Sequence, residues 1–139
     1  MKIIGLDMGD RWVGTAISDE LGITARPYRT VEHRELVPFL KNVIREERIE
    51  IIVVGYPKTM GGRESEQTKK IVSHVDELKQ EISEIEWVLW DERLSSKQAA
   101  GLKKTKTKDE KIASHSIAAA LILKTYLDYL DFKKQLLTT

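Results

Sequence analysis

The chain has 139 residues, no cysteine and nearly balanced charge, with 23 Lys and Arg against 22 Asp and Glu and a net charge of +1. This length predicts one domain over residues 1–139 that buries its own core, and the absence of cysteine excludes disulfides and thiolate metal sites. The charge balance argues against a nucleic-acid coat protein and leaves room for local basic patches. The sequence contains no secretory signal pattern and no apolar run long enough to span a membrane, so we expect a soluble, cytoplasmic protein.

The first half of the sequence predicts three strands, a helix and a fourth strand. The connection Gly9-Asp10-Arg11 between the first two apolar segments is short enough for a hairpin. Apolar residues at helical spacing indicate the helix, and the β-branched run Ile51-Ile52-Val53-Val54 is typical of a strand buried on both faces. In chain order the expected elements are strands at 2–8, 12–18 and around 24–31, a helix at 34–47 and a strand at 51–55.

The second half of the sequence predicts helices on either side of one more strand. Ile71, Val75 and Leu78 share one helical face, and capping-box patterns at Ser95 and Thr107 predict two helix starts. The expected elements are a loop at 57–63, a helix at 64–82, a strand at 85–91, a short helix from Ser95, a lysine-rich linker at 103–108 and a final helix at about 110–132. The order β-β-β-α-β-α-β-α-α predicts an α/β fold with one mixed five-stranded sheet and helices on both faces.

Asp7 and Glu92 are the first candidates for chemistry, because each ends a short and otherwise apolar segment that reads as a buried strand. An acid in such a place is costly to desolvate unless a cation or a hydrogen-bond donor meets it. Ligands of open α/β sheets bind at the C-terminal ends of the strands, so the pair predicts a divalent-metal site. A strand lying between the two would separate their backbones by about 10 Å. The alternatives are that Asp7 caps a turn or pairs with Arg11, and that Glu92 is a surface charge paired with Arg93.

His115 is the third candidate. It forms one helical stripe with Ala119 and Ile122, and it stands at the end of that stripe nearest the expected strand edge. An imidazole is a softer ligand than the oxygen donors that Mg²⁺ prefers, whereas its pKa range suits a proton shuttle. The alternative is a capping or surface histidine.

Basic side chains provide candidates for binding nucleic-acid phosphates. The lysine run at 103–108 fits either a solvated linker or an arm that contacts phosphates. Lys69 and Lys70 could extend the same patch, whereas Trp87 and Trp90 are expected in the core rather than as stacking platforms. The candidate nucleic-acid-binding residues are Arg11, Lys58, Arg63, Arg93, Lys103, Lys104, Lys106 and Lys108.

Four sequence blocks in a fixed order carry a resemblance to a known family. They are Gly5-Leu6-Asp7-Met8-Gly9 with Arg11 and Gly14, Val53-Val54-Gly55-Tyr56-Pro57 with Met60-Gly61-Gly62, Asp91-Glu92-Arg93-Leu94-Ser95, and His115-Ser116-Ile117-Ala118-Ala119-Ala120. Together they resemble the YqgF family of pre-16S rRNA nucleases, also called Holliday-junction-resolvase-like proteins. The resemblance spans nearly the whole chain.

This resemblance implies an RNase H-like fold and an endonuclease that depends on Mg²⁺ or Mn²⁺. It implies that Asp7 and Glu92 are metal ligands and that both act in catalysis with His115. The implied partner is nucleic acid and not a membrane: precursor 16S rRNA, trimmed at its 5′ end during ribosome biogenesis, or alternatively branched DNA. A resolvase would need a dimer, whereas an RNA trimmer could act as a monomer, so the oligomeric state stays open.

One position departs from the family pattern. The family's helix acid, usually Asp, falls on His115, which leaves two carboxylates and puts a full two-metal site in question. A nucleic-acid-binding module without catalysis is therefore a further alternative. A nucleotide-binding role is another, because the segment from Gly5 to Gly14 resembles the first phosphate loop of actin-like sugar kinases, although those proteins need two such domains.

Overall fold

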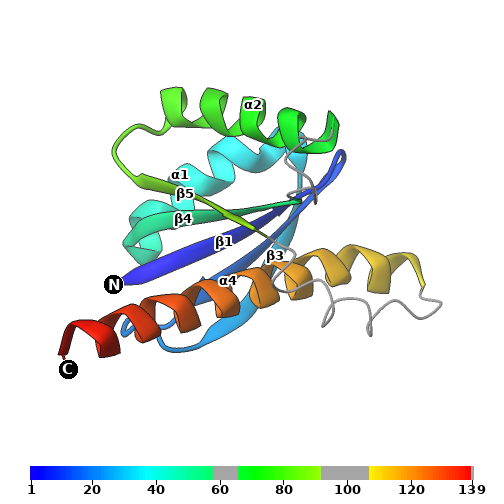
Figure 1. Ribbon diagram of the computed structural model, residues 1–139. Coiled ribbons are helices and arrows are strands. Elements are labelled where there is room, and N and C mark those ends of the chain that lie inside the picture. The colour runs from blue at the N-terminus through cyan, green and yellow to red at the C-terminus, as the bar shows by residue number, and fades with distance from the viewer. Residues whose placement is uncertain (58–65, 92–106, 139) are drawn as a thin grey trace.

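The computed structural model describes residues 1–57, 66–91 and 107–138, and its strands form one five-stranded sheet in the order β3-β2-β1-β4-β5 (Figure 1). The strands are β1 (Lys2–Met8), β2 (Trp12–Ser18), β3 (Ala25–Glu32), β4 (Ile49–Tyr56) and β5 (Glu86–Asp91). β2 pairs antiparallel with β1 and β3, whereas β4 runs parallel to both β1 and β5. The C-terminal ends of β1, β4 and β5 therefore meet at one edge of the sheet, which we call the parallel edge.

Helices cover both faces of this sheet (Figure 1). The short 3-10 turn η1 (His33–Glu35) leads into α1 (Leu36–Glu47), which lies with α2 (Glu66–Glu81) on one face, while α4 (Lys108–Thr138) crosses the other. The predicted mixed sheet with helices on both faces is confirmed. Among the described residues, no helix is both long and apolar enough to cross a membrane.

Alternation along the central strand β1 divides its side chains between two apolar clusters. Leu6 and Met8 are buried against α1 and α2, whereas Ile3 is buried with Leu123 of α4. Full burial of one such aliphatic side chain contributes about 1.5–3 kcal/mol. The same alternation directs Asp7 toward α4.

Both tryptophans of β5 pack against the helices, as the sequence predicts. Trp87 belongs to the cluster under α1 and α2, and its Nε1–H donates to the carbonyl oxygen of Ile82 at 3.0 Å. Trp90 belongs to the cluster under α4, and its Nε1–H donates to the hydroxyl of Thr125 at 2.9 Å. Each ring is thus held by packing and one hydrogen bond rather than displayed as a stacking surface.

The element boundaries follow the sequence pattern closely at the start of the chain and less closely at its end. β1 and β2 occupy the predicted ranges, and the hairpin between them is closed by the N–H of Gly9, which donates to the carbonyl oxygen of Trp12 at 2.9 Å. The capping box before α4 is confirmed, since the N–H of Glu110 donates to Thr107 Oγ1 at 3.2 Å and the N–H of Thr107 donates to the Glu110 carboxylate at 3.4 Å. The helix ends at Thr138 rather than at 132.

Three predicted segments lie outside the described residues. They are residues 58–63 of the loop, the helix from Ser95 and positions 103–106 of the linker.

The contact between α4 and the sheet depends on glycine in three neighbouring strands. A Cβ added at Gly5 of β1 would lie 2.9 Å from the Cβ of Leu123 and 3.2 Å from the carbonyl oxygen of Ala119. A Cβ at Gly14 of β2 would overlap the backbone carbonyl of His115, and one at Gly55 of β4 would overlap the end of the Ile122 side chain. The helix therefore rests on the bare backbone of the sheet at these points.

These contacts predict a clear order of stability for two alanine variants. Gly14→Ala should destabilise the protein by about 3 kcal/mol or more, because the new methyl group meets rigid helix backbone. Gly55→Ala should cost only about 1–2 kcal/mol, because the Ile122 side chain it meets can rotate away. Urea denaturation of the two variants and the wild type measures both values. Equal losses, or a larger loss for Gly55→Ala, would contradict the close approach of α4 to β2.

A pair of histidines joins η1 to α2 and gives the fold a pH dependence. The rings of His33 and His74 lie with centroids 4.6 Å apart. Burial, and next the proximity of His74, lower the pKa of His33 below its ordinary value, with Lys70 acting in the same direction and Asp10 opposing it. The unfolded chain, in which His33 regains its ordinary pKa near 6.5, therefore binds more protons than the folded chain.

It follows that stability falls as pH drops from about 7.5 to about 5.5, through the ordinary histidine range. We expect a lower Tm at the acid end in thermal scans of the wild type and a shallower decline in His33→Asn. The carboxyl groups whose pKa values are lowered, such as Asp19 and Glu47, lose their contribution only at lower pH. Parallel pH profiles for the wild type and His33→Asn would show that His33 is not the group responsible.

Candidate active site

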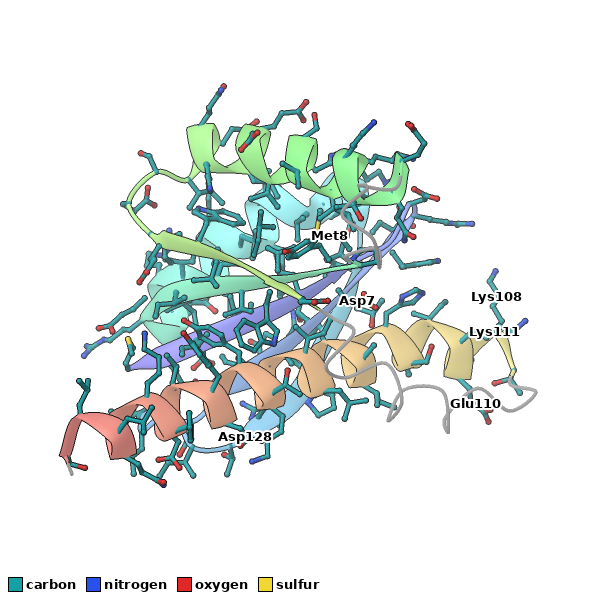
Figure 2. The ribbon with its side chains drawn as sticks, viewed as in Figure 1. Asp7, Met8, Lys108, Glu110, Lys111 and Asp128 are labelled. Carbon is teal, nitrogen blue, oxygen red and sulfur yellow. The ribbon has the colours of Figure 1, made fainter. Side chains whose placement is uncertain are left out.

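Asp7 stands near the C-terminal end of β1 at the parallel edge, on the face covered by α4 (Figure 2). Its register partners are Gly14 on β2 and Gly55 on β4. The carboxylate therefore has no side chain beside it on either neighbouring strand. This arrangement leaves space around the acid that only α4 or a ligand can fill.

His115 is brought to this space by the packing of α4 on β2. Its backbone carbonyl lies over Gly14, and its Cε1 would be 3.7 Å from a Cβ on Gly9. Its Nδ1 lies 3.7 Å from Oδ2 of Asp7, which is an ion-pair distance but too long for a hydrogen bond. The side chains of His115 and Asp7 are 34% and 25% exposed, so both are accessible to solvent and to a substrate.

The charge of Asp7 is not neutralised by a lysine or arginine of the described segments. Arg11, the nearest arginine in the sequence, contacts other groups instead. Its guanidinium lies 5.2 Å from the ring centroid of Trp12, and its carbonyl oxygen accepts a hydrogen bond from the N–H of His33. The alternative that Asp7 pairs with Arg11 is thus not what the structure shows. A partly buried carboxylate without such a partner is suited to holding a cation.

The other predicted carboxylate, Glu92, lies outside the described residues. β5 ends one residue before it, at Asp91, and the row of register partners across the parallel edge is Trp90, Gly55, Asp7 and Gly14. β4 lies between β1 and β5, so the backbones of those two strands are separated by about 10 Å.

Among the residues that the structure describes, no group of three or more His, Asp or Glu side chains could hold a metal ion.

Of the predicted phosphate-binding residues, two lie in the described segments. Arg11 is exposed in the turn after β1, and Lys108 is exposed at the N-terminal end of α4 (Figure 2). Lys70 lies on α2 and pairs with Asp10 at 2.9 Å. The remaining candidates, which are Lys58, Arg63, Arg93, Lys103, Lys104 and Lys106, lie outside the described residues.

Two features of this edge were not predicted from the sequence. The first is that Gly14 and Gly55 flank Asp7. Each glycine belongs to one of the four sequence blocks that carry the family resemblance, but only the strand register brings them beside the acid. The second is the approach of His33 to His74, which lie on different elements and share no sequence motif. Neither could be found without knowing how the strands and helices pair.

Comparison with known proteins identifies the family. A family model described as "RuvX: Holliday junction resolvase" matches residues 1–129. The chain belongs to the RuvX family. The YqgF resemblance is thereby confirmed, and so is the expectation of a nuclease.

Curated relatives span nearly the same length as this RuvX-family chain. A protein of Acetivibrio thermocellus is 36% identical over 138 residues, covering 92% of this chain and 96% of the relative. A protein of Clostridium tetani is 39% identical over 137 residues, covering 92% and 96%. Both bear the name "Putative pre-16S rRNA nuclease".

Solved structures support the RNase H-like fold. Thermus thermophilus RuvC in complex with a Holliday junction substrate superposes with a TM-score of 0.55 at 15% identity, covering 91% of this chain and 94% of the other. A second structure of Thermus thermophilus RuvC gives a TM-score of 0.53 at 14% identity, with the same coverage. At such low identity the likeness concerns the fold alone.

Proposed function

We propose that this RuvX-family protein is a metal-dependent endonuclease that trims the 5′ end of precursor 16S rRNA. The observation that carries the proposal is the partly exposed Asp7 carboxylate at the parallel edge, flanked by two glycines and faced by His115. The names of the curated relatives support the choice of rRNA as the substrate. Such a substrate would place the protein in the cytoplasm, where ribosomes are assembled.

We further propose that Asp7 and Glu92 would hold Mg²⁺ or Mn²⁺. The oxygen donors of Asp7 suit these hard cations, and no lysine or arginine of the described segments competes for them. Such an ion, when bound, activates water and offsets the charge that builds up on a phosphodiester. Both acids are parts of the sequence blocks that carry the family resemblance, and Gly55, the register partner of Asp7 on β4, has no side chain to compete with an ion at the carboxylate.

His115 is the proposed group for orienting Asp7 or moving a proton. Imidazole is a soft ligand for Mg²⁺, which favours a role beside the carboxylate over direct coordination. At 3.7 Å from Asp7 Oδ2, the Nδ1 atom needs only a small side-chain movement to hydrogen-bond to the carboxylate. The other ring nitrogen would then be available to exchange a proton with the substrate or with water.

The basic candidates would hold the phosphates on either side of the scissile bond. These are Arg11, Lys58, Arg63, Arg93, Lys103, Lys104, Lys106 and Lys108. Each phosphate neutralised releases counterions, so substrate affinity should fall as salt increases.

Cleavage of branched DNA is a second candidate, favoured by the description of the family as a Holliday junction resolvase. Symmetric cleavage of a junction needs two active sites, and therefore two copies of this chain. Comparing a labelled precursor 16S rRNA leader with a four-way DNA junction as substrates separates the two functions, and sedimentation of the active species shows whether it is a dimer.

The first prediction of this proposal concerns Asp7. Asp7→Asn should lower metal-dependent cleavage by more than about 100-fold, since loss of a residue that only supports a metal ligand already costs about 10–100-fold. The fold should survive, because the amide has the same shape and the side chain is partly exposed. Asp128→Asn, which changes an exposed acid on α4, is the matched control and should cleave normally. Full activity in Asp7→Asn would reject the assignment.

The second prediction concerns His115. His115→Ala should lower kcat by about 10²–10⁴-fold if the ring moves a proton in the reaction. His115→Asp restores the acid usual in the family and should retain metal-dependent cleavage. Ser114→Ala, at the preceding position of α4, controls for changes in the helix. Normal cleavage by His115→Ala would remove His115 from the mechanism, and binding of RNA without cleavage by the wild type would favour the non-catalytic module.

A further inference from the structure

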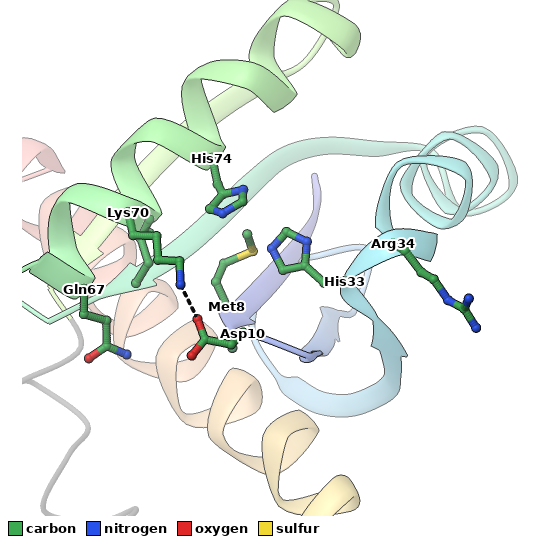
Figure 3. Close-up of a pocket in the computed structure, with 9 residues that line it drawn as sticks. Met8, Asp10, His33, Arg34, Gln67, Lys70 and His74 are labelled. Atoms are coloured by element: carbon green, nitrogen blue, oxygen red, sulfur yellow. Dashed lines mark hydrogen bonds and ion pairs between the residues drawn. The ribbon is translucent and has the colours of Figure 1, made fainter.

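A cavity opens at the same edge of the sheet as Asp7 but on the opposite face (Figure 3). It has a volume of about 390 Å³ and lies between the end of β1, the turn that follows it, η1 and α2. We call it the histidine pocket. The residues that matter for its chemistry are Met8, Ile71, His33, His74, Gln67 and Lys70.

The histidine pocket lies directly behind the candidate active site. Met8 follows Asp7 in β1, and consecutive side chains of a strand point to opposite faces. Met8 belongs to the cluster under α1 and α2, whereas Asp7 faces His115 of α4. A polymer that passes around the end of β1 would therefore meet both sites.

Two connections fix the walls of this pocket to the turn after β1. The N–H of His33 donates to the carbonyl oxygen of Arg11 at 2.8 Å, which holds η1. Lys70 Nζ lies 2.9 Å from Asp10 Oδ1, which holds α2 (Figure 3). The pocket is thus formed by elements that the turn itself positions.

The inner part of the pocket suits a flat, partly apolar group. Ile71 and Met8 line the pocket and are both buried, and the rings of His33 and His74 lie beside them with centroids 4.6 Å apart (Figure 3). Because burial lowers the pKa of His33, its ring is neutral at pH 7 and offers one hydrogen-bond donor and one acceptor. A thioether, an aliphatic chain and imidazole rings with polar edges are a surface on which a nucleobase can rest.

The mouth of the pocket suits an anion. Lys70 is paired with Asp10, but their side chains are 61% and 86% exposed, and such surface pairs are weak enough to exchange partners. Gln67 adds an exposed amide at the same rim. Arg34 does not add to this charge, because its guanidinium bonds to the Glu32 carboxylate at 2.6 Å and points away from the pocket in Figure 3.

We propose that the histidine pocket binds one nucleotide of the substrate strand, with the base against Met8 and Ile71 beside the two imidazoles and the phosphate at Lys70. The volume lies within the range of small-ligand sites. The inference rests on the proposed nuclease function for the identity of the strand, but the binding of a nucleotide does not depend on cleavage. The pocket would act as a positioning site that sets which bond reaches Asp7.

Titration of the full chain with mononucleotides tests the binding. The probes are adenosine and uridine 5′-monophosphate, with the matching nucleosides and inorganic phosphate as their separate parts, and the readout is the imidazole NMR signals of His33 and His74. We expect the nucleotides to shift both signals saturably and each part alone to bind much more weakly. Silence of both rings, or equal affinity for inorganic phosphate and nucleotide, would overturn the proposal.

Variants then separate the two halves of the pocket. Lys70→Ala should weaken nucleotide binding about tenfold while leaving nucleoside binding unchanged, because it removes only the charged contact with phosphate. His74→Ala should weaken nucleotides and nucleosides alike. Lys79→Ala, at the far end of α2, is the matched control, and thermal unfolding shows that each variant is folded. Equal nucleotide binding by Lys70→Ala and Lys79→Ala would overturn the assignment of the phosphate.

Kinetics on an oligoribonucleotide distinguish a substrate subsite from a site for free nucleotides. Lys70→Ala should raise KM about tenfold with little change in kcat, since the contact lies away from the reacting phosphate. Nucleotide binding without any change in KM would overturn the assignment to the substrate strand. The two proposals fail separately: an inactive protein that binds mononucleotides rejects only the nuclease, and an active one that binds none rejects only the pocket.

Discussion

The close packing of α4 on a bare stretch of sheet is the constraint on which the candidate active site depends. Glycines at positions 5, 14 and 55 remove the side chains that would otherwise hold the helix away from three neighbouring strands. At Gly14 the helix backbone itself occupies the place of a side chain, so the position of His115 is set by main-chain contact rather than by rotamer choice. Gly14 and Gly55 also flank Asp7, which means that two of these three glycines both seat the helix and keep neighbouring strand side chains away from the acid.

This arrangement is compatible with a histidine at the position where the family resemblance implies an acid. An aspartate at position 115 would face Asp7 at close range, and two carboxylates there would repel each other unless a cation lay between them. An imidazole at the same place can donate a hydrogen bond to Asp7 and needs no cation for stability. The substitution therefore lessens the dependence of the site on metal for its structure and leaves Asp7 and Glu92 as the proposed oxygen ligands.

The sequence was sufficient to predict the order of the elements in the described segments, the sheet type and the acid at its edge, because these follow from short-range patterns. Alternation and turn residues determine β1 and β2, and the Thr107 capping box determines the start of α4. The alignment of Asp7 with Gly14 and Gly55 could not be predicted, because register is set by pairing between distant segments. The end of α4 was underestimated for a different reason: its last buried residue is Leu127, and the exposed turns beyond it do not pack on the sheet, so burial does not mark where the helix ends.

The strand end at residues 7–10 links the two faces of the sheet. Asp7 points toward α4 and Met8 toward α2, and their Cα atoms are only about 3.8 Å apart. The next two residues belong to the turn: the N–H of Gly9 donates to the carbonyl oxygen of Trp12, and the carboxylate of Asp10 pairs with Lys70. Because these four residues are contiguous and belong to the central strand or its hairpin, a displacement of one site moves the other with it. A nucleic-acid strand bound on both faces would thus be held in a fixed register by the rigid end of β1, without requiring a hinge or a closing loop.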